Sequence, residues 1–176
     1  MNSCQRCALA LTRSHVVPGE GDLRPYVMLV GEAPGANEDR SGRPFAGAAG
    51  KILDQMLAEA GMARDDVFIT SVLKCRPPKN RDPKKEEIAA CSPYLHQQIA
   101  LLAPRVICPM GNHALHLLLG GEVALGDTHG NVVYRADQAY FPLYHPAAAI
   151  YNRHLLPLIL DDMRKLKEFL PNLLNR

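Results

Sequence analysis

Residues 26–30 read YVMLV, and a polar, glycine-rich loop that begins GEAPG follows over residues 31–50. Five consecutive apolar residues that stop at a glycine predict a buried strand, because the run is too short for an ordinary helix. After the loop, apolar residues recur at helical spacing until Gly61, which supplies a stop for a helix. These helical positions are Ile52, Leu53, Met56, Leu57 and Ala60.

The same succession continues along the chain. Further strands are predicted at residues 67–70, 106–108 and 140–144, and further helices at residues 86–102, 112–119 and 155–170. The pair Ser92-Pro93 is expected to restart the helix in which it lies. Strands that alternate with helices predict an α/β fold of three layers, α/β/α, with a short central, mostly parallel sheet. Ligands bind beyond the carboxyl ends of such strands, where three polar loops follow residues 30, 70 and 144.

Size and composition indicate an ordinary globular protein. The 176 residues, 47% hydrophobic and 22% charged, suit a single domain over residues 1–176 with a sizeable core. No run of about 18 apolar residues is present, and the first ten residues lack the pattern of a signal peptide. We therefore expect a cytoplasmic monomer that does not bind a membrane.

The net charge of +2 is too small to indicate a nucleic-acid-binding protein by itself. One stretch is locally basic, and it is interpreted either as a solvated loop or as a contact for DNA. Its cations are Lys74, Arg76, Lys79, Arg81, Lys84 and Lys85.

Four of the five cysteines are placed as ligands of one metal site. Cys4 and Cys7 form a C-x-x-C pair, Cys75 opens a proline-rich loop, and Cys91 lies in the following predicted helix. In a chain without an export signal, this pattern favours metal binding over disulfides, although scattered buried thiols are the alternative. The spacing of the second pair is not that of a zinc ribbon, which favours an iron–sulfur cluster and leaves zinc open. Cys108 is interpreted as a core residue.

Three loop motifs, taken together, resemble one known family. They are GEAPG with Glu38-Asp39 and GRPFAG at residues 31–47, KCRPP with Asn80-Arg81 at residues 74–81, and HPAA at residues 145–148. In this order, and with the cysteines so placed, they resemble the family 4 uracil-DNA glycosylases, thermostable-type enzymes with a four-iron, four-sulfur cluster. The resemblance extends from Cys4 to about Leu170. It implies a uracil-DNA glycosylase-like fold, a [4Fe–4S] cluster on Cys4, Cys7, Cys75 and Cys91, and hydrolysis of the N-glycosidic bond of uracil in DNA during base-excision repair.

The resemblance also implies how the base is held. A glycosylase must flip uracil out of DNA before the bond is reachable. Phe45 resembles the residue that stacks on the flipped base, and backbone N–H groups around Gly31, Glu32 and Ala33 resemble those that bind the uracil oxygens. Asn80 resembles a position next to the pocket.

Bond cleavage leaves negative charge on uracil and positive charge on the sugar. His145 resembles the hydrogen-bond donor to the carbonyl oxygen that gains charge, and a neutral imidazole suffices for this role. Glu32 lies where the functional glutamate of the family lies. Glu38 is the second carboxylate in reach; the division of roles between the two stays open, and Glu38-Asp39 alternatively caps a turn.

The remaining predicted site residues contact the DNA strand. Lys74, Arg76 and Arg81 supply charge to a proline-rich loop that presents its N–H groups to phosphates. After the His-Pro motif, Ile150, Tyr151 and Arg153 are the alternatives for a side chain that enters the base stack.

Two departures from the family pattern bear on the chemistry. Ser71 stands where most of these enzymes carry the Asn that reads the Watson–Crick edge of uracil, so we expect a wider base range that includes other deaminated bases. Nothing between Asn80 and Glu86 resembles the histidine-bearing insertion of related enzymes that stay covalently bound to their product, so we expect ordinary turnover.

Two other functions are weighed against the glycosylase. A non-catalytic iron–sulfur DNA-binding module of the same fold is favoured only by Ser71. A nucleotide-binding protein is disfavoured because the loop after residue 30 is neither G-x-G-x-x-G nor a P-loop with its lysine. Release of uracil from DNA separates the enzyme from both.

Overall fold

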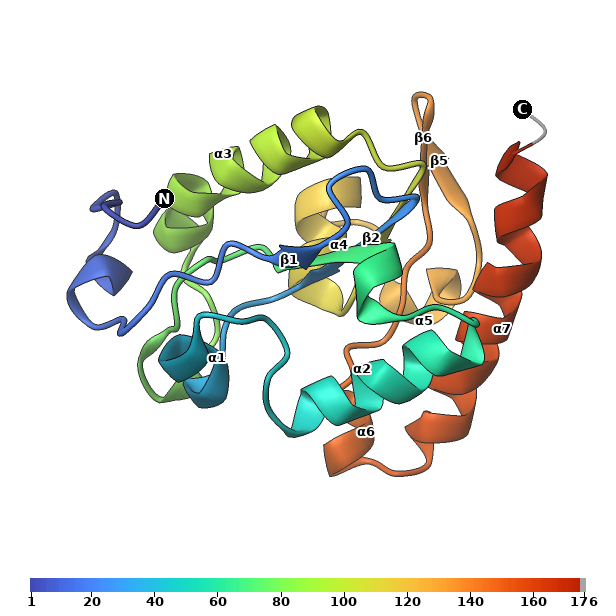
Figure 1. Ribbon diagram of the computed structural model, residues 1–176, viewed down its shortest axis with the longest axis horizontal. Coiled ribbons are helices and arrows are strands. Elements are labelled where there is room, and N and C mark those ends of the chain that lie inside the picture. Colours follow the sequence, from blue (N-terminus) through green and yellow to red (C-terminus); the bar gives the residue numbers. More distant parts are fainter. Residues whose placement is uncertain (175–176) are drawn as a thin grey trace.

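The computed structural model describes residues 1–174 and has three layers, with helices on both faces of one six-stranded sheet (Figure 1). The strand order is β1-β3-β2-β4-β6-β5, with the four inner strands parallel and the two edge strands antiparallel to their neighbours. The strands are β1 Glu20–Gly21, β2 Val27–Gly31, β3 Val67–Ser71, β4 Val106–Pro109, β5 Val133–Arg135 and β6 Gln138–Tyr140. The predicted three-layer fold with a mostly parallel sheet is confirmed.

Seven α-helices and three short 3-10 helices connect the strands within the described residues. They are η1 Ala8–Leu11, α1 Ala36–Ser41, α2 Ala48–Glu59, η2 Arg64–Asp66, η3 Pro78–Asn80, α3 Lys85–Leu102, α4 Asn112–Leu119, α5 Leu125–Thr128, α6 Ala148–Tyr151 and α7 Leu155–Leu174. The bounds predicted for α4 are confirmed. Within residues 1–174, no helix is both long and apolar enough to cross a bilayer.

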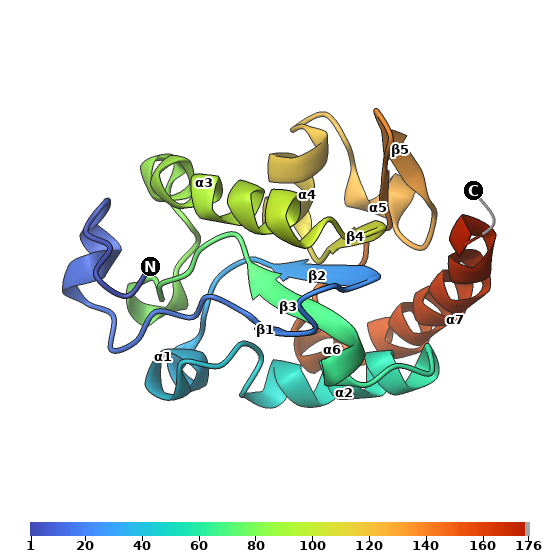
Figure 2. The same cartoon turned by 45° about the horizontal axis from the view of Figure 1, so that its top comes forward.

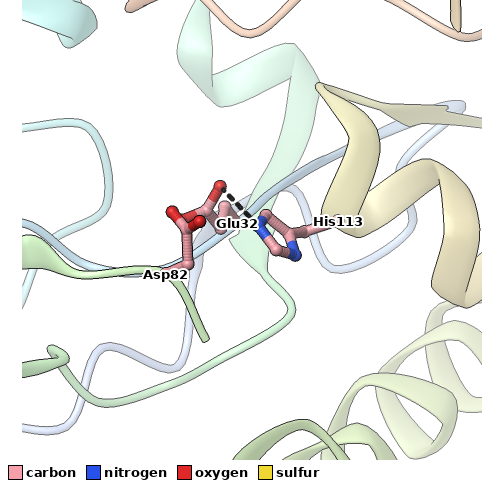
Figure 3. Close-up of side chains that lie close together, drawn as sticks. All are labelled: Glu32, Asp82 and His113. Atoms are coloured by element: carbon pink, nitrogen blue, oxygen red, sulfur yellow. Dashed lines mark ion pairs between the residues drawn. The ribbon is translucent and has the colours of Figure 1, made fainter. Parts of the chain in front are cut away.

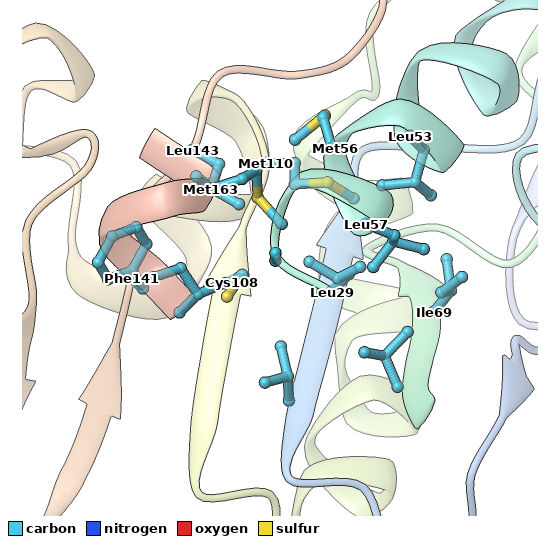
Figure 4. Packing of buried hydrophobic residues seen from close by; sticks show 14 of the residues in the cluster. Leu29, Leu53, Met56, Leu57, Ile69, Cys108, Met110, Phe141, Leu143 and Met163 are labelled. Atoms are coloured by element: carbon cyan, nitrogen blue, oxygen red, sulfur yellow. The ribbon is translucent and has the colours of Figure 1, made fainter. Parts of the chain in front are cut away.

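Alternate residues of each inner strand face opposite cores. Leu29 and Ile69 pack with α2 and α7 on one face, as Figure 4 shows. Met28 and Val30 pack with α3 and α4 on the other face (Figure 2). Because both faces are covered, β2 and β3 are buried along their whole lengths, and this explains the continuous apolar runs in their sequences.

Two predictions about secondary structure are wrong. The strand expected at residues 140–144 lies instead at Gln138–Tyr140; beyond it Phe141 and Leu143 still donate backbone hydrogen bonds to Ile107 and Pro109 of β4, each at 2.9 Å, and Leu143 forms an isolated bridge with Met110. The helix expected to restart at Ser92-Pro93 is continuous, with Pro93 inside α3. Proline removes one N–H donor, but Cys91 and Leu95 on either side of it anchor α3 in the core.

Candidate functional site

A cleft of about 430 Å³ opens at the carboxyl ends of β2 and β3. It brings together the three polar loops that the sequence placed at this edge of the sheet, as expected when parallel strands end side by side. Most of the predicted base-binding residues line it: Glu32, Ala33, Glu38, Phe45, Ser71, Asn80 and His145. Three predicted DNA contacts line it as well, namely Arg81 and two of the candidates for entering the base stack, Ile150 and Tyr151. Gly31 lies at the end of β2, directly beneath the ring of Phe45.

Phe45 is fixed at the floor of the cleft. Its side chain is 8% exposed, and its ring centroid lies 5.6 Å from that of His145 at an interplanar angle of 31°. A Cβ on Gly31 would stand 2.8 Å from Phe45 Cζ, so only glycine at position 31 leaves room for the ring. The backbone of Phe45 has φ 50°, a left-handed conformation that an L-residue adopts only when neighbouring contacts hold it.

Arg64, which no sequence motif marks, supplies those contacts. Its guanidinium donates to the carbonyl oxygens of Pro44 at 3.1 Å, Phe45 at 2.8 Å and Gly50 at 3.4 Å. The same group is paired with Asp54 at 2.7 Å. These partners lie 10 to 20 residues away in the chain, so no local pattern marks Arg64 as part of the site.

The hydrogen bonds of His145 fix its tautomer. The backbone N–H of Ala147 donates to Nδ1 at 3.2 Å, so in the neutral ring the proton sits on Nε2, which is left to donate. Burial lowers the pKa of His145 to about 4, and the charge of Glu38 opposes this only in part. His145 is therefore neutral at pH 7 and still a hydrogen-bond donor, which is the state that its predicted role needs.

Acidification is expected to destabilise the fold through His145. The unfolded imidazole takes up its proton near pH 6.5, whereas in the folded protein the group stays neutral until about pH 4. Its contribution to stability is therefore complete above pH 6.5 and is lost as the pH falls to 4. The loss amounts to about 1–3 kcal/mol, the upper value applying to a ring fully shielded from water. Urea unfolding of the parent and of His145→Gln between pH 4 and 7 should give a flatter profile for the variant. Parallel profiles would contradict the assignment.

Glu38 uses its carboxylate to hold the loop together. Oε2 accepts from the N–H of Gly35 at 3.0 Å, and Oε1 accepts from the N–H of Gly47 at 2.9 Å. The first bond caps helix α1, and the second ties that helix to the start of α2. Of the two interpretations left open by the sequence, this geometry favours the turn-stabilising one.

Glu32 extends its carboxylate toward two residues from other segments (Figure 3). Its Oε2 lies 3.7 Å from Nε2 of His113 in α4, and Asp82 stands nearby, with the ligand atoms of all three within 4.8 Å of one another. Burial raises the pKa of Glu32; His113 opposes the rise and Asp82 adds to it. His113 belongs to no motif in α4, so the sequence does not mark it as part of the site.

Ser71 presents its hydroxyl to the cleft. The residue is 6% exposed, and its Oγ has no hydrogen-bond partner within the part of the chain that the structure describes. It lies beside Gly31, its register partner in the parallel ladder. An unpartnered polar atom at the wall of a cleft is available to a ligand.

The structure corrects one predicted DNA contact in the basic loop. Lys74 is 1% exposed and turned into the protein, so it cannot reach a phosphate; the segment after β3 runs through the core before it emerges. Arg76 remains partly exposed and donates to Asn80 Oδ1 at 2.7 Å. Arg81 binds both oxygens of the buried Glu87, at 2.9 and 2.5 Å, so its charge is already paired.

Away from the cleft, four cysteines converge on a second cavity. Cys4, Cys7, Cys75 and Cys91 all line it, together with the basic residues Arg6, Arg13 and Lys74. Arg13 donates to Cys75 Sγ at 3.4 Å, and the backbone N–H of Lys74 donates to Cys91 Sγ at 3.3 Å. Sulfur atoms that accept N–H bonds amid cations are suited to carry negative charge, as metal-bound thiolates do. Cys108 is fully buried in the core, as predicted.

Comparison with known proteins adds independent findings. A family model described as the uracil DNA glycosylase superfamily matches residues 18–173. The chain is similar to proteins named type-4 uracil-DNA glycosylase. That of Sulfurisphaera tokodaii is 45% identical over 94% of this chain and 80% of its own length. Those of Saccharolobus solfataricus and Pyrobaculum aerophilum are 44% and 48% identical, over 97% and 85% of this chain and 83% and 81% of their own lengths.

Proposed function

Because this chain belongs to the uracil DNA glycosylase superfamily, we propose that its cleft receives a uracil flipped out of DNA and that the protein excises it. The observation that carries the proposal is the neutral, Nε2-protonated His145 beside the ring of Phe45 in a cleft wide enough for a base. The ring of Phe45 stacks on the base. The backbone N–H groups of Glu32 and Ala33, just after β2, donate hydrogen bonds to the uracil oxygens.

The reaction breaks the bond between C1′ of the sugar and N1 of uracil, with the electron pair leaving on the base. His145 donates from Nε2 to the carbonyl oxygen on which the charge gathers, and this lowers the barrier without a full proton transfer. Water adds at C1′ and gives up a proton. Glu32 is the carboxylate placed to favour the sugar cation and hold that water, with His113 on its far side.

Single-turnover release of uracil from a labelled oligonucleotide tests the function, with an otherwise identical thymine oligonucleotide as control. An abasic site at the uracil position alone is the expected product. Binding of both oligonucleotides without release would instead identify the non-catalytic DNA-binding module, which the family relationship does not favour.

Tyr151 is the side chain best placed to fill the gap in the base stack. It lies at the end of α6 on the rim of the cleft and is 90% exposed, whereas Ile150 is 43% exposed and Arg153 does not line the cleft. An exposed aromatic ring beside a base-sized cleft is suited to insert between base pairs.

Tyr151→Ala is expected to slow uracil release from duplex DNA roughly ten-fold and to leave single-stranded substrate nearly unaffected, because only the duplex has a stack to hold open. Release rates on both substrates, with Arg153→Ala as the control variant, check this. An equal loss on both substrates would show that Tyr151 does something other than fill the stack.

The cysteine cavity fits a [4Fe–4S] cluster better than zinc. Tetrahedral zinc at a Zn–S distance of about 2.3 Å places its sulfur ligands about 3.8 Å apart. Among residues 1–174, no three of the cysteine sulfurs lie within 4.8 Å of one another. A cluster binds each thiolate through a different iron atom and therefore needs wider spacing. With a cluster bound, the N-terminal segment is tied to the loop after β3 and to α3.

Protein purified without oxygen is expected to be brown, with broad absorbance near ~400 nm and about four iron atoms per chain. Cys4→Ala should lower the iron content and the thermal midpoint before it lowers the rate per folded molecule, because the four ligands lie in a cavity separate from the cleft. Cys108→Ala removes a cysteine outside the cavity and should keep the iron. A colourless protein with stoichiometric zinc would overturn the iron assignment.

A further inference from the structure

Lys74 places a cation in the interior without a carboxylate partner. Its side chain is among the largest that are fully buried, and its Nζ donates to Thr70 Oγ1 and to the carbonyl oxygen of Ser71, each at 2.6 Å. Throughout residues 1–174, no Asp or Glu oxygen lies within ion-pairing distance of it. An isolated buried charge is costly, so a lysine in this position keeps its proton only where another negative charge balances the ammonium group.

The cysteine thiolates of the adjoining cavity would supply negative charge close to Lys74. Lys74 lines that cavity, precedes Cys75 in the chain, and donates its backbone N–H to Cys91 Sγ. Four thiolates around either [4Fe–4S]²⁺ or Zn²⁺ leave a net charge of about −2. Lys74 therefore contacts Cys91, one of the residues that would hold the metal, through its backbone, and it contacts the end of β3 through its side chain.

The end of β3 is also a wall of the cleft. Ser71 lies there with its hydroxyl available, and its carbonyl oxygen is held by Lys74. Thr70 Oγ1, which accepts from Lys74 Nζ, donates in turn to the carbonyl oxygen of Pro18 at 2.9 Å. The ammonium group of Lys74 therefore holds the backbone of Ser71, and the position of this backbone sets the direction of the Ser71 hydroxyl.

We propose that Lys74 is a positioning residue that couples the metal centre to base recognition: its ammonium group balances the charge of the metal–thiolate centre and holds Ser71 in place. This rests on the proposed function, in which Ser71 faces the flipped base. The coupling predicts that removal of the charge weakens metal retention and base release together.

Lys74→Met, which keeps the length of the side chain and removes its charge, tests the coupling. Lys167→Met, at an exposed site in α7 away from the cleft and the cysteine cavity, is the matched control. The measurements are the half-time of metal loss to a chelator, followed by absorbance, and the single-turnover rate of uracil release per metal-loaded molecule. For Lys74→Met we expect metal loss to be several-fold faster and release roughly ten-fold slower. The control should match the parent in both.

Thr70→Val separates the two halves of the proposal, since it removes one partner of the ammonium group and keeps the charge. We expect Thr70→Val to retain metal like the parent and to release uracil several-fold more slowly. This measurement tests the proposal even if Lys74→Met does not fold. Parental metal retention and release in Lys74→Met, or parental release in Thr70→Val, would overturn the coupling. If the parent itself releases no uracil, the proposed function fails, while the chelator measurement still tests the link to the metal.

Discussion

Replacement of His145 by alanine is expected to slow uracil release by about 100- to 1,000-fold and to leave DNA binding nearly unchanged. The hydrogen bond from Nε2 strengthens only as charge develops on the base, so its loss raises the barrier more than it weakens the ground state. The structure prepares this donor in advance, because the N–H of Ala147 occupies Nδ1 and burial keeps the ring neutral.

Single-turnover rates at saturating enzyme, together with binding of an uncleavable substrate, check this prediction. His145→Gln keeps a donor and much of the volume beside Phe45, so it should recover part of the rate that His145→Ala loses. His154→Ala removes an exposed histidine outside the cleft and should match the parent. An unchanged rate in His145→Ala would remove His145 from the mechanism.

Ser71→Asn is expected to speed uracil release roughly ten- to a hundred-fold and to narrow the range of bases. An amide donates to one edge atom of uracil and accepts from the neighbouring N–H at once, whereas one hydroxyl satisfies only part of that pattern. A polar group left unsatisfied in the complex costs about 1–3 kcal/mol. The same amide disfavours cytosine, whose donor and acceptor are reversed.

Matched oligonucleotides carrying uracil, hypoxanthine, xanthine or cytosine test both the rate and the range. Ser71→Ala is the control, since it shows whether the parent uses the hydroxyl, which has no partner within the described residues. The hypothesis fails if the parent is already fast and strict for uracil and Ser71→Asn changes neither property. An ordered water or the backbone would then read the base.

The fold was predictable because its signals are local. β2, β3 and β4 are short apolar runs between polar loops, a pattern that burial on both sheet faces imposes on the residues themselves. The edge strands β1 and β5 were missed because two or three partly exposed residues carry no periodic pattern. The chain beyond Tyr140 reads as apolar strand, yet only contacts with β4 decide where pairing stops.

The candidate site divides in the same way. From the sequence alone, the motif residues Phe45, Ser71 and His145 were placed in loops that follow parallel strands, and the topology of such a sheet brings those loops to one edge. Only the tertiary structure decided that Glu38 holds the loop, that Lys74 is buried, and that Arg64 and His113 stand behind the cleft. The physical reason is that distant segments of the chain decide whether a side chain is buried and which group it pairs with. The local sequence does not specify those contacts.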